Sequence, residues 1–247
     1  MNSKIFWLSI LAIIISFFGG FYLANSLNGN ELLKLRAENE QLKKNNSPKP
    51  QDDAESTLTD DELRQKIAFA DKNPDNLKYQ RDLGMALLSY GVMKQNAELI
   101  SESARLLHRV YDSNPKDFDV TVALGTAFYD IASLKNDAEN FKKSREFYSK
   151  ALEQKPDNAS VRADFGSTFV FVDPPDFARA DTELQKALQI DPKNARALLL
   201  MTQMLVKQNK STEAEKYLAR LKEINPDAPS LQDLSAQMSR EESTNQK

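Results

Sequence analysis

A proline-centred turn signal recurs along most of the chain and constrains its fold more than any other feature. The signals are short polar segments centred on Pro74, Pro115, Pro156, Pro192 and Pro226, at intervals of 41, 41, 36 and 34 residues. Proline cannot continue the hydrogen-bond ladder of a helix, so each signal ends the amphipathic helical stretch before it. Because each interval has room for two helices, the chain is predicted to be all-α and built from about four stacked helix pairs.

Composition and charge favour a helical fold and exclude several classes of function. Glycine is scarce, at 7 of 247 residues, while alanine, leucine, lysine and glutamate are plentiful, which favours helix over sheet. The 33 basic and 36 acidic residues nearly cancel, so nucleic acid is not an expected partner. The absence of cysteine excludes disulfides, thiolate metal sites and thiol catalysis.

The intervals also align with one another. Leu83-Gly84-Met85-Ala86-Leu87 matches Leu124-Gly125-Thr126-Ala127-Phe128 at a shift of 41 residues. Asn96 matches Asp137, where either side chain can cap the second helix of a pair. The third interval carries Gly166 at the glycine position, and each unit then has a small residue, an apolar residue four positions later and a closing proline.

This pattern resembles the tetratricopeptide repeat over about residues 60–240. The resemblance implies an α-solenoid of about four helix pairs with capping helices, whose first helices line a concave groove. It identifies the fold and leaves the partner open, because such repeats occur in many unrelated complexes.

Three departures from the usual repeat carry structural predictions. Gly84 to Pro115 and Gly125 to Pro156 each span 31 residues, against the usual ~24. The extra length equals about two helical turns, so both helices of these units are expected to lengthen by about one turn. The insertion Asp173–Asp176 is predicted to form a rigid turn. Thr202 replaces glycine in the fourth unit, where looser packing between the two helices is expected.

Two terminal helices are expected to cap the array. Residues 60–71 form a lone helix before Pro74, and residues 229–240 form a closing helix that ends a repeat domain over residues 59–240. Residues 241–247 are predicted to be a disordered tail. The inward positions of the closing helix are Leu231, Leu234 and Met238.

The N-terminal segment is predicted to be a membrane anchor. After a short tail at residues 1–4, residues 5–25 form a predicted transmembrane helix, because their apolar run spans roughly 28 Å. A cleaved signal peptide is the alternative, with Ala24-Asn25-Ser26 as a cleavage site. The expected location is the cell inner membrane, single-pass, with the repeat domain extracytoplasmic, that is, periplasmic. A strict count of flanking positive charges would instead keep that domain in the cytoplasm.

Residues 30–44 are predicted to form a helical stalk. Its heptad seam would support a parallel homodimer, since a polar asparagine on the seam fixes register, and a lone solvated helix is the alternative. Residues 45–58 contain two prolines and are interpreted as a flexible linker. The seam residues are Leu32, Leu35, Asn39 and Leu42.

Catalytic and metal-binding motifs are lacking. His108 is the single histidine, and with no second histidine and no cysteine it is interpreted as a surface or half-buried scaffold residue. No phosphate-binding glycine loop, dinucleotide fingerprint or nucleophile elbow is present. The chain is therefore predicted not to be an enzyme and to need no cofactor or metal.

Phasing the first helix of each unit on its glycine, or on Thr202, predicts a groove of mixed polar and apolar lining. We expect a protein or peptide client there, bound as an amphipathic helix or an extended segment. Arg81 is the single cation in the predicted lining, which disfavours a clamp for a C-terminal carboxylate. The predicted lining residues are Arg81, Met85, Leu88, Val122, Thr126, Tyr129, Asp130, Ser167, Val170 and Gln203, with Ala163, Leu199 and Val206 on the same phase.

The resulting functional hypothesis is a membrane-tethered adaptor that holds a client in its groove. Membrane-anchored repeat proteins of this layout are similar to the chaperone-like subunits of bacterial cytochrome c maturation, which hold apocytochrome tails. That resemblance implies a role in assembling envelope or cytochrome c proteins. The alternative is a structural protein that associates with itself through the stalk and has no client groove.

Overall fold

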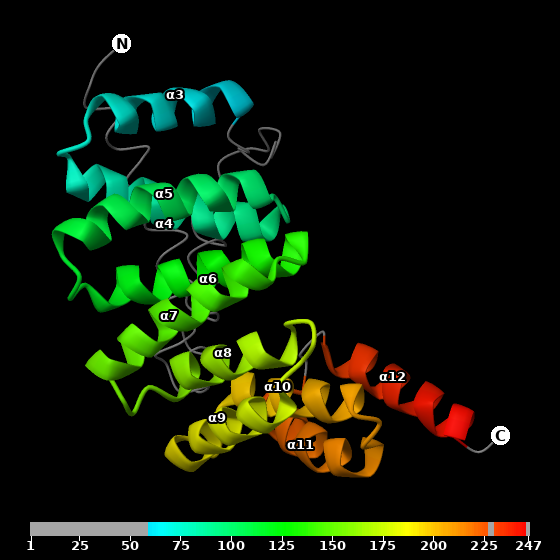
Figure 1. The fold of residues 1–247 in the computed structure, drawn as a ribbon. Coiled ribbons are helices and arrows are strands. Elements are labelled where there is room, and N and C mark those ends of the chain that lie inside the picture. Colours follow the sequence, from blue (N-terminus) through cyan, green and yellow to red (C-terminus); the bar gives the residue numbers. More distant parts are fainter. Residues whose placement is uncertain (1–58, 227–229, 246–247) are drawn as a thin grey trace, which may run out of the picture. The chain divides into compact units, whose positions relative to one another are not determined.

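A computed structural model describes residues 59–226 and 230–245 of the chain (Figure 1). Within these residues it contains ten helices and no strand, so the all-α prediction is confirmed. The helices are α3 (Asp60–Lys72), α4 (Leu77–Met93), α5 (Ala97–Ser113), α6 (Phe118–Lys135), α7 (Ala138–Gln154), α8 (Ala159–Val170), α9 (Phe177–Ile190), α10 (Ala195–Lys207), α11 (Ser211–Ile224) and α12 (Ser230–Asn245).

The first of two compact units ends at Ala86, and its described part is α3 with the start of α4. Thr59 and Glu62 form a capping box that starts α3. The buried amide of Gln80 on α4 donates to the Ala70 carbonyl oxygen at 2.6 Å and to that of Asn73 at 3.2 Å. Gln80 thus provides a partner for one of the last carbonyl groups of α3 and for that of its C-cap residue. The lone helix predicted at residues 60–71 is confirmed.

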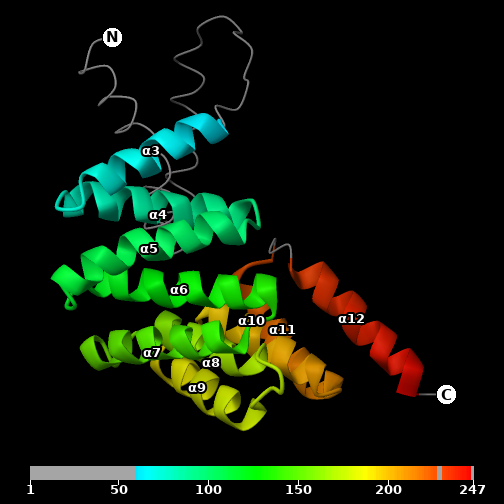
Figure 2. The same cartoon turned by 45° about the horizontal axis from the view of Figure 1, so that its top comes forward.

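The second unit begins at Leu87 and contains the end of α4 and the helices α5 to α12. Consecutive helices pack as antiparallel neighbours, α6 on α7, α8 on α9 and α10 on α11 (Figure 2). We call α6, α8 and α10 the A helices and α5, α7, α9 and α11 the B helices. Each A helix also packs on the B helix before it, and α8 contacts both α6 and α10.

The long repeats have long helices, as their spacing predicted. The helices α4, α5 and α7 have 17 residues and α6 has 18, whereas α8 to α11 have 12 to 14. Three A-to-B turns contain one residue with positive φ, at Gln95, Asn136 and Asn209. The added residues therefore lie inside helices, and the turns stay tight.

Gly125 is a point of close approach between α6 and α7. The ring of Tyr148 lies where a side chain on Gly125 would be, since an added Cβ would be 2.7 Å from two ring carbons. The buried hydroxyl of Ser144 donates to the Gly125 carbonyl oxygen at 2.8 Å. At the corresponding place in α10, Thr202 is fully buried and its hydroxyl donates to the Leu198 carbonyl oxygen at 2.9 Å. The looser packing expected there stays a prediction.

The closing helix α12 buries three side chains against the rest of the second unit. Leu231, Leu234 and Met238 are 5%, 3% and 4% exposed and belong to the same core cluster as residues of α10 and α11, so the predicted inward positions are confirmed. The helix ends at Asn245, beyond residue 240, where the sequence placed the end of the domain.

The insertion in the third repeat connects α8 to α9 through residues 171–176. The backbone N–H of Asp176 donates to the Phe169 carbonyl oxygen at 2.9 Å, which ties the end of the connection to α8. The carboxylate of Asp176 accepts from the backbone N–H of Arg179 at 3.1 Å and so begins α9.

The predicted anchor (5–25), stalk (30–44, with Leu32, Leu35, Asn39 and Leu42) and linker (45–58) lie outside the described residues. Within the described part of the chain, no helix has the length and apolar character that crossing a membrane requires.

Candidate functional site

Polar side chains from three successive A helices meet on one face of the second unit. We call Tyr129 and Asp130 of α6, Asp164 and Ser167 of α8, and Arg196 of α10 the A-face cluster. Electrostatic interactions link Arg196 to Tyr129, Asp130 and Asp164, and the Ser167 hydroxyl donates to the backbone carbonyl oxygen of Asp164 at 2.6 Å.

The starts of the A helices set the phase of these side chains. Asp117, Asn158 and Asn194 cap α6, α8 and α10, each accepting from the backbone N–H three residues later at 3.1, 2.9 and 2.9 Å. Because the three helices begin in the same way, side chains at related positions face the same side. Because the same N-cap recurs in three helices, side chains from three repeats together form the surface of the A-face cluster.

The ion pair between Asp164 and Arg196 joins α8 to α10. Arg196 Nε lies 2.8 Å from Asp164 Oδ1, and the two side chains are 43% and 26% exposed for the arginine and the aspartate. Asp164 is surrounded by protein on most sides, and solvent still reaches part of its side chain. The pair orients the one cation of the cluster and leaves part of it accessible.

Burial dominates the electrostatics of the two carboxylates. It raises the pKa of Asp130 to about 6; Arg196 opposes this shift and Asp164 adds to it. Burial also raises the pKa of Asp164, against the effect of Arg196. For Arg196, burial acts to lower the pKa, but Asp164 and the two tyrosines Tyr129 and Tyr148 outweigh it, so the pKa is raised. The cluster thus holds two carboxylates for one guanidinium.

The tyrosine of the cluster is held by other aromatic rings. Tyr129 packs edge-on against Phe141 and Phe171, with ring centroids 5.7 and 6.4 Å away. Its pKa is raised, mainly by burial. These contacts therefore hold the Tyr129 ring in one orientation beside the cluster.

Of the predicted groove residues, the structure brings Tyr129, Asp130 and Ser167 together. Gln203 is half-buried, and since it follows Arg196 by seven residues it lies on the same face of α10. The Thr126 hydroxyl lies 3.1 Å from the Tyr148 hydroxyl, and Val122 packs against the core around Tyr148. These last two positions continue the face towards the start of α6.

Other predicted groove positions are wrong as surface positions, because their side chains lie in the core. Val170 is 1% exposed, Val206 is 5% and Ala163 is fully buried. All three pack in the cluster that joins α8, α9, α10 and α11, where short helices bury more of their circumference. Ser167 is also fully buried, and its hydroxyl donates to the Asp164 carbonyl oxygen on the same helix.

The remaining predicted positions are on α4 and on α10. Leu199 is half-buried and packs against the core cluster. Leu88 is 8% exposed, so its role as a lining residue is also wrong. Arg81 and Met85 belong to the first compact unit and are half-buried.

Sequence reasoning missed Asp164, Arg196 and Tyr148. Asp164 and Arg196 precede the predicted positions Ser167 and Leu199 by three residues, which is about one helical turn, so extending the predicted phase by a turn would have found them. Tyr148 of α7 is 2% exposed, and its hydroxyl lies 3.1 Å from the Thr126 hydroxyl.

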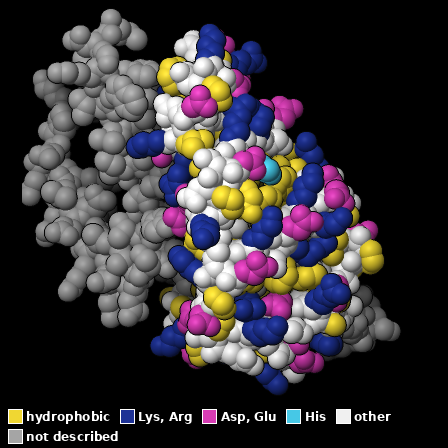
Figure 3. All heavy atoms as spheres, turned by 60° about the vertical axis from the view of Figure 1, so that its left-hand side comes forward, with side chains coloured by type: hydrophobic (Ala, Val, Ile, Leu, Met, Phe, Trp, Pro, Cys, Tyr) yellow, Lys and Arg dark blue, Asp and Glu magenta, His cyan; other side chains and the backbone are white. Residues whose placement is uncertain are grey.

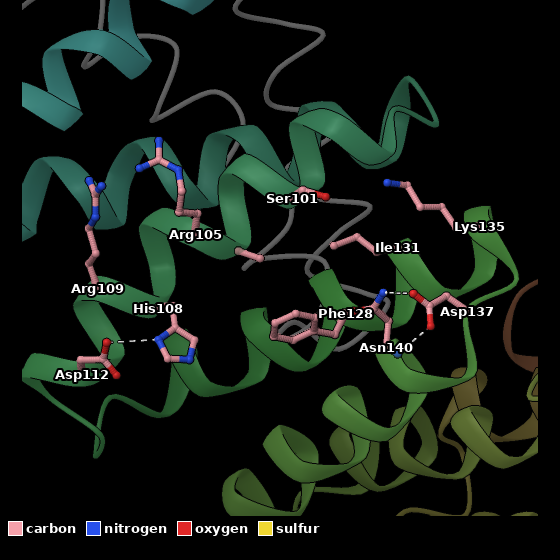
Figure 4. A pocket seen from close by; sticks show the side chains of 11 residues that line it. Ser101, Arg105, His108, Arg109, Asp112, Phe128, Ile131, Lys135, Asp137 and Asn140 are labelled. Carbon is pink, nitrogen blue, oxygen red and sulfur yellow. Dashed lines mark hydrogen bonds and ion pairs between the residues drawn. The ribbon is translucent and has the colours of Figure 1, made fainter.

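A separate pocket of ≈ 520 Å³ lies between α5, α6 and the start of α7 (Figure 4). It includes His108, whose side chain is 48% exposed and whose Nδ1 lies 3.1 Å from Asp112 Oδ2. The interpretation of His108 as a scaffold surface residue agrees with this position. Among the residues that the structure describes, no group of His, Cys, Asp and Glu is arranged to hold a metal ion.

Comparison with known proteins defines the class. Residues 125–158 and 176–238 each match a family model of the tetratricopeptide repeat. These two segments therefore match the tetratricopeptide repeat that the proline spacing predicted. Proteins of this class typically serve as scaffolds for other proteins.

Solved structures share the fold at low sequence identity. MamA is 15% identical, with a TM-score of 0.52 over 72% of this chain and 97% of MamA. TTC0263, a thermophilic repeat protein of Thermus thermophilus, is 15% identical, with a TM-score of 0.54 over 74% of this chain and 89% of its own. YrrB, described as having an unusual peptide-binding site, is 18% identical, with a TM-score of 0.52 over 71% and 84%. A comparison with curated proteins gave no match.

Proposed function

We propose that this protein is a membrane-tethered adaptor that binds a segment of a client protein across α6, α8 and α10. One observation carries the proposal: three successive repeats contribute to a single, partly exposed polar cluster. The polar side chains of α6, α8 and α10 converge at one place. A client segment lying across the A helices would contact all three helices there. Extended or helical peptides bind repeat arrays in this way.

The charges of the cluster favour a client segment that carries a basic side chain. Asp130 and Asp164 outnumber Arg196, and burial makes the charge of Asp130 unfavourable, with a pKa of about 6. A basic side chain of the client placed beside Asp130 would offset this cost. The bound cation would lower the pKa of Asp130, so client affinity is expected to increase as the pH rises through about 6.

The remainder of the proposal extends this binding role. Residues 5–25 would hold the array at the inner membrane, with the array in the periplasm, and no catalytic step is assigned to it. The stalk would present the array as a dimer through Leu32, Leu35, Asn39 and Leu42. Holding a client without modifying it fits a chaperone-like task in the assembly of envelope or cytochrome c proteins. Support comes from the repeat fold and from YrrB, a repeat protein with a peptide-binding site.

Site-directed crosslinking tests the proposed surface. A photoreactive amino acid replaces Gln203, on the A face, in the full-length chain; the matched control carries it at Lys186, an exposed position on the B helix α9. Crosslinked products are identified from membranes with and without Arg196→Ala. We expect a client that is captured from Gln203, is absent from Lys186, and is lost on substitution of Arg196.

The opposite pattern would support self-association. If both positions capture the same proteins, or capture only a second copy of the chain, the client surface is wrong. Replacement of Leu35 and Leu42 by serine would then be expected to abolish function, because the stalk would carry it.

A further inference from the structure

Two arginines from different B helices lie on one aromatic ring, and neither belongs to the A-face cluster. Arg145 comes from α7 and Arg179 from the first turn of α9, and their guanidinium carbons are 5.2 and 5.9 Å from the centre of the Phe169 ring. The charge of Arg179 acts on the pKa of Arg145, so the two cations are close enough to repel each other. We call these three residues and Asp176 the arginine site.

The aromatic ring of this site is fixed in the core. Phe169 is 7% exposed and belongs to the cluster that joins α8 to α11. It packs edge-on against Phe165, with ring centroids 5.2 Å apart. A guanidinium group is attracted to the face of such a ring. The ring therefore positions two cations that their mutual repulsion would otherwise keep apart.

Arg145 is half-buried and makes no ion pair with the residues that the structure describes. Its Nη1 donates to the Thr168 carbonyl oxygen at 3.3 Å, which is its one hydrogen bond within the described part of the chain. A guanidinium group has five N–H donors, so most of those on Arg145 have no protein partner there. Burial lowers the pKa of Arg145, Arg179 lowers it further, and Asp176 opposes both effects.

Arg179 stands at the end of α9 that least favours a cation. It is the third residue of this helix, and a helix N-terminus carries partial positive charge. Its side chain is 72% exposed, and its Nε lies 3.3 Å from Asp176 Oδ2. Its two terminal nitrogens make no hydrogen bond with any described residue. Both arginines are thus placed where an added negative charge would be favourable.

The arginine site holds more positive than negative charge. Among the described residues, Asp176 is the one carboxylate whose charge acts on the pKa of Arg145. Asp176 also caps α9, where its Oδ1 accepts from the backbone N–H of Arg179 at 3.1 Å. Two guanidinium groups therefore share one carboxylate that is already engaged. Side chains of both signs are interspersed over the face that Figure 3 shows, so an excess of one sign is a local feature.

Other acidic residues near the two arginines along the chain do not offset this excess. Glu146 and Asp173 make no ion pair with any residue that the structure describes. Glu183, one turn after Arg179, pairs instead with Arg162, at 2.8 Å. The positive charge of the arginine site is therefore left for a ligand.

We propose that the arginine site binds a phosphate group. The oxygens of a tetrahedral phosphate can accept from both guanidinium groups at once, whereas a planar carboxylate fills the fork of one. The bound dianion replaces the repulsion between Arg145 and Arg179 by attraction to both. Free phosphate and phosphate esters share this chemistry. The arginine site has no residue in common with the A-face cluster, so it does not depend on the client surface proposed above.

Calorimetric titration of the full-length chain at neutral pH and constant ionic strength tests the site, with inorganic phosphate as the probe. We expect a dissociation constant of about 1 mM or tighter, and at least about fivefold weaker binding of acetate. O-phosphoserine distinguishes the two sources of the group. Binding as tight as that of inorganic phosphate assigns the site to phosphate esters, and binding of inorganic phosphate alone assigns it to the free ion; both results support the site.

Variants of the protein assign the binding to the two arginines. Arg145→Gln and Arg179→Gln are each expected to weaken phosphate binding at least about fivefold. Asp176→Asn keeps an N-cap for α9 but removes the competing carboxylate, and is expected to tighten binding at least about threefold. The matched control Arg64→Gln, at an exposed arginine of α3, is expected to change the affinity less than about twofold. Thermal melts confirm that each variant is folded.

Three results would overturn the proposal. The first is no binding at about 20 mM inorganic phosphate. The second is acetate binding as tightly as phosphate, which would make this a carboxylate site. The third is equal weakening by Arg64→Gln and Arg179→Gln, which would mean attraction to positive charge in general. None of these results affects the client crosslinks at Gln203, so the two proposals fail independently.

Discussion

At the scale of single residues, the A-face cluster contains a carboxylate, that of Asp130, whose charged form burial disfavours. A rise in the pKa of Asp130 from 3.8 to about 6 corresponds to about 3 kcal/mol against its charged form, before solvent screening reduces the figure. A neutral amide of the same shape would avoid that cost. Perturbed groups of this kind gather at functional sites, which is the physical basis for placing the client there.

Replacing Asp130 with asparagine is expected to stabilise the protein at neutral pH. The pKa of Asp130 is higher in the folded than in the unfolded chain, so its favourable contribution is present below about pH 4 and is lost as the pH rises through about 6. Asp130→Asn should therefore raise the free energy of unfolding by about 1–2 kcal/mol at pH 7.5, and the gain should vanish near pH 4. Urea unfolding at both pH values measures this.

The matched control for this prediction is Asp157→Asn, on the exposed turn before α8, for which we expect little change at either pH. A gain of the same size at pH 4 and pH 7.5 would show that ionisation of Asp130 is not its cause.

Two glycines on A helices should respond differently to alanine. A Cβ on Gly125 would meet the ring of Tyr148 at 2.7 Å, and this ring is 2% exposed and has no room to move. A Cβ on Gly166 would meet Leu184 at 3.1 Å, so this side chain would need to move by only a few tenths of an ångström. Gly125→Ala should cost about 1–3 kcal/mol, while Gly166→Ala should be near neutral, because better helix propensity offsets mild crowding.

Thermal or urea unfolding of the two alanine variants in parallel measures the loss of stability that each substitution causes. Equal costs would mean that the contact between Gly125 and Tyr148 is not the tightest point between these helix pairs.

At the scale of elements, the repeats share a starting device for their B helices, with one exception. Asn96, Asp137 and Asp176 each accept a backbone hydrogen bond and cap α5, α7 and α9. Lys210 stands at the corresponding place before α11 and makes no side-chain cap bond. Its backbone φ of −105° is close to the values of the other three, while its ψ of 56° is lower than their 77° to 104°, and its side chain cannot accept a hydrogen bond.

Supplying the missing cap should stabilise α11. Lys210→Asp is expected to raise the free energy of unfolding by about 0.5–2 kcal/mol, through the cap bond and through a negative charge at the helix N-terminus. Lys210→Ser provides the bond without the charge and should give most of the gain. Urea unfolding compares both with Lys210→Ala, which provides neither. If alanine matches aspartate, removal of the lysine charge is the cause, and the capping argument fails.

At the scale of the whole molecule, the proposed client surface and the predicted N-terminal anchor would together make an adaptor. The anchor at residues 5–25 would add an attachment to the membrane. Its length in apolar residues matches a hydrocarbon core of about 30 Å.

Membrane attachment is expected to depend on that segment alone. The full-length chain should sediment with membranes and resist extraction at alkaline pH, whereas a chain that begins at residue 59 should not. Protease added outside intact spheroplasts should degrade the repeats if they are periplasmic. Protection of the repeats would place them in the cytoplasm, and recovery of a shortened mature chain in the soluble fraction would mean that the N-terminal segment is cleaved.

Much of this architecture could be predicted because its signals are local. The proline at the end of each interval, the capping residues Asn96 and Asp137, and the seven-residue excess in the long repeats all act within one or two helical turns. The structure accordingly contains the lone helix α3, the lengthened helices α4 to α7 and the inward side chains of α12. The helical phase around Gly125 likewise indicated Tyr129 and Asp130 as partners in one surface.

Tertiary structure alone decided which of the predicted groove positions remain on a surface and which groups join them. Val170 and Val206 have the right helical phase, but neighbouring helices cover them, and coverage depends on how three helices rotate about one another. The pair of Asp164 and Arg196, 32 residues apart in the chain, exists only because α8 and α10 are packed side by side. Periodicity records the direction of each side chain along its own helix, whereas burial and charge pairing depend on distances between helices that no single helix encodes.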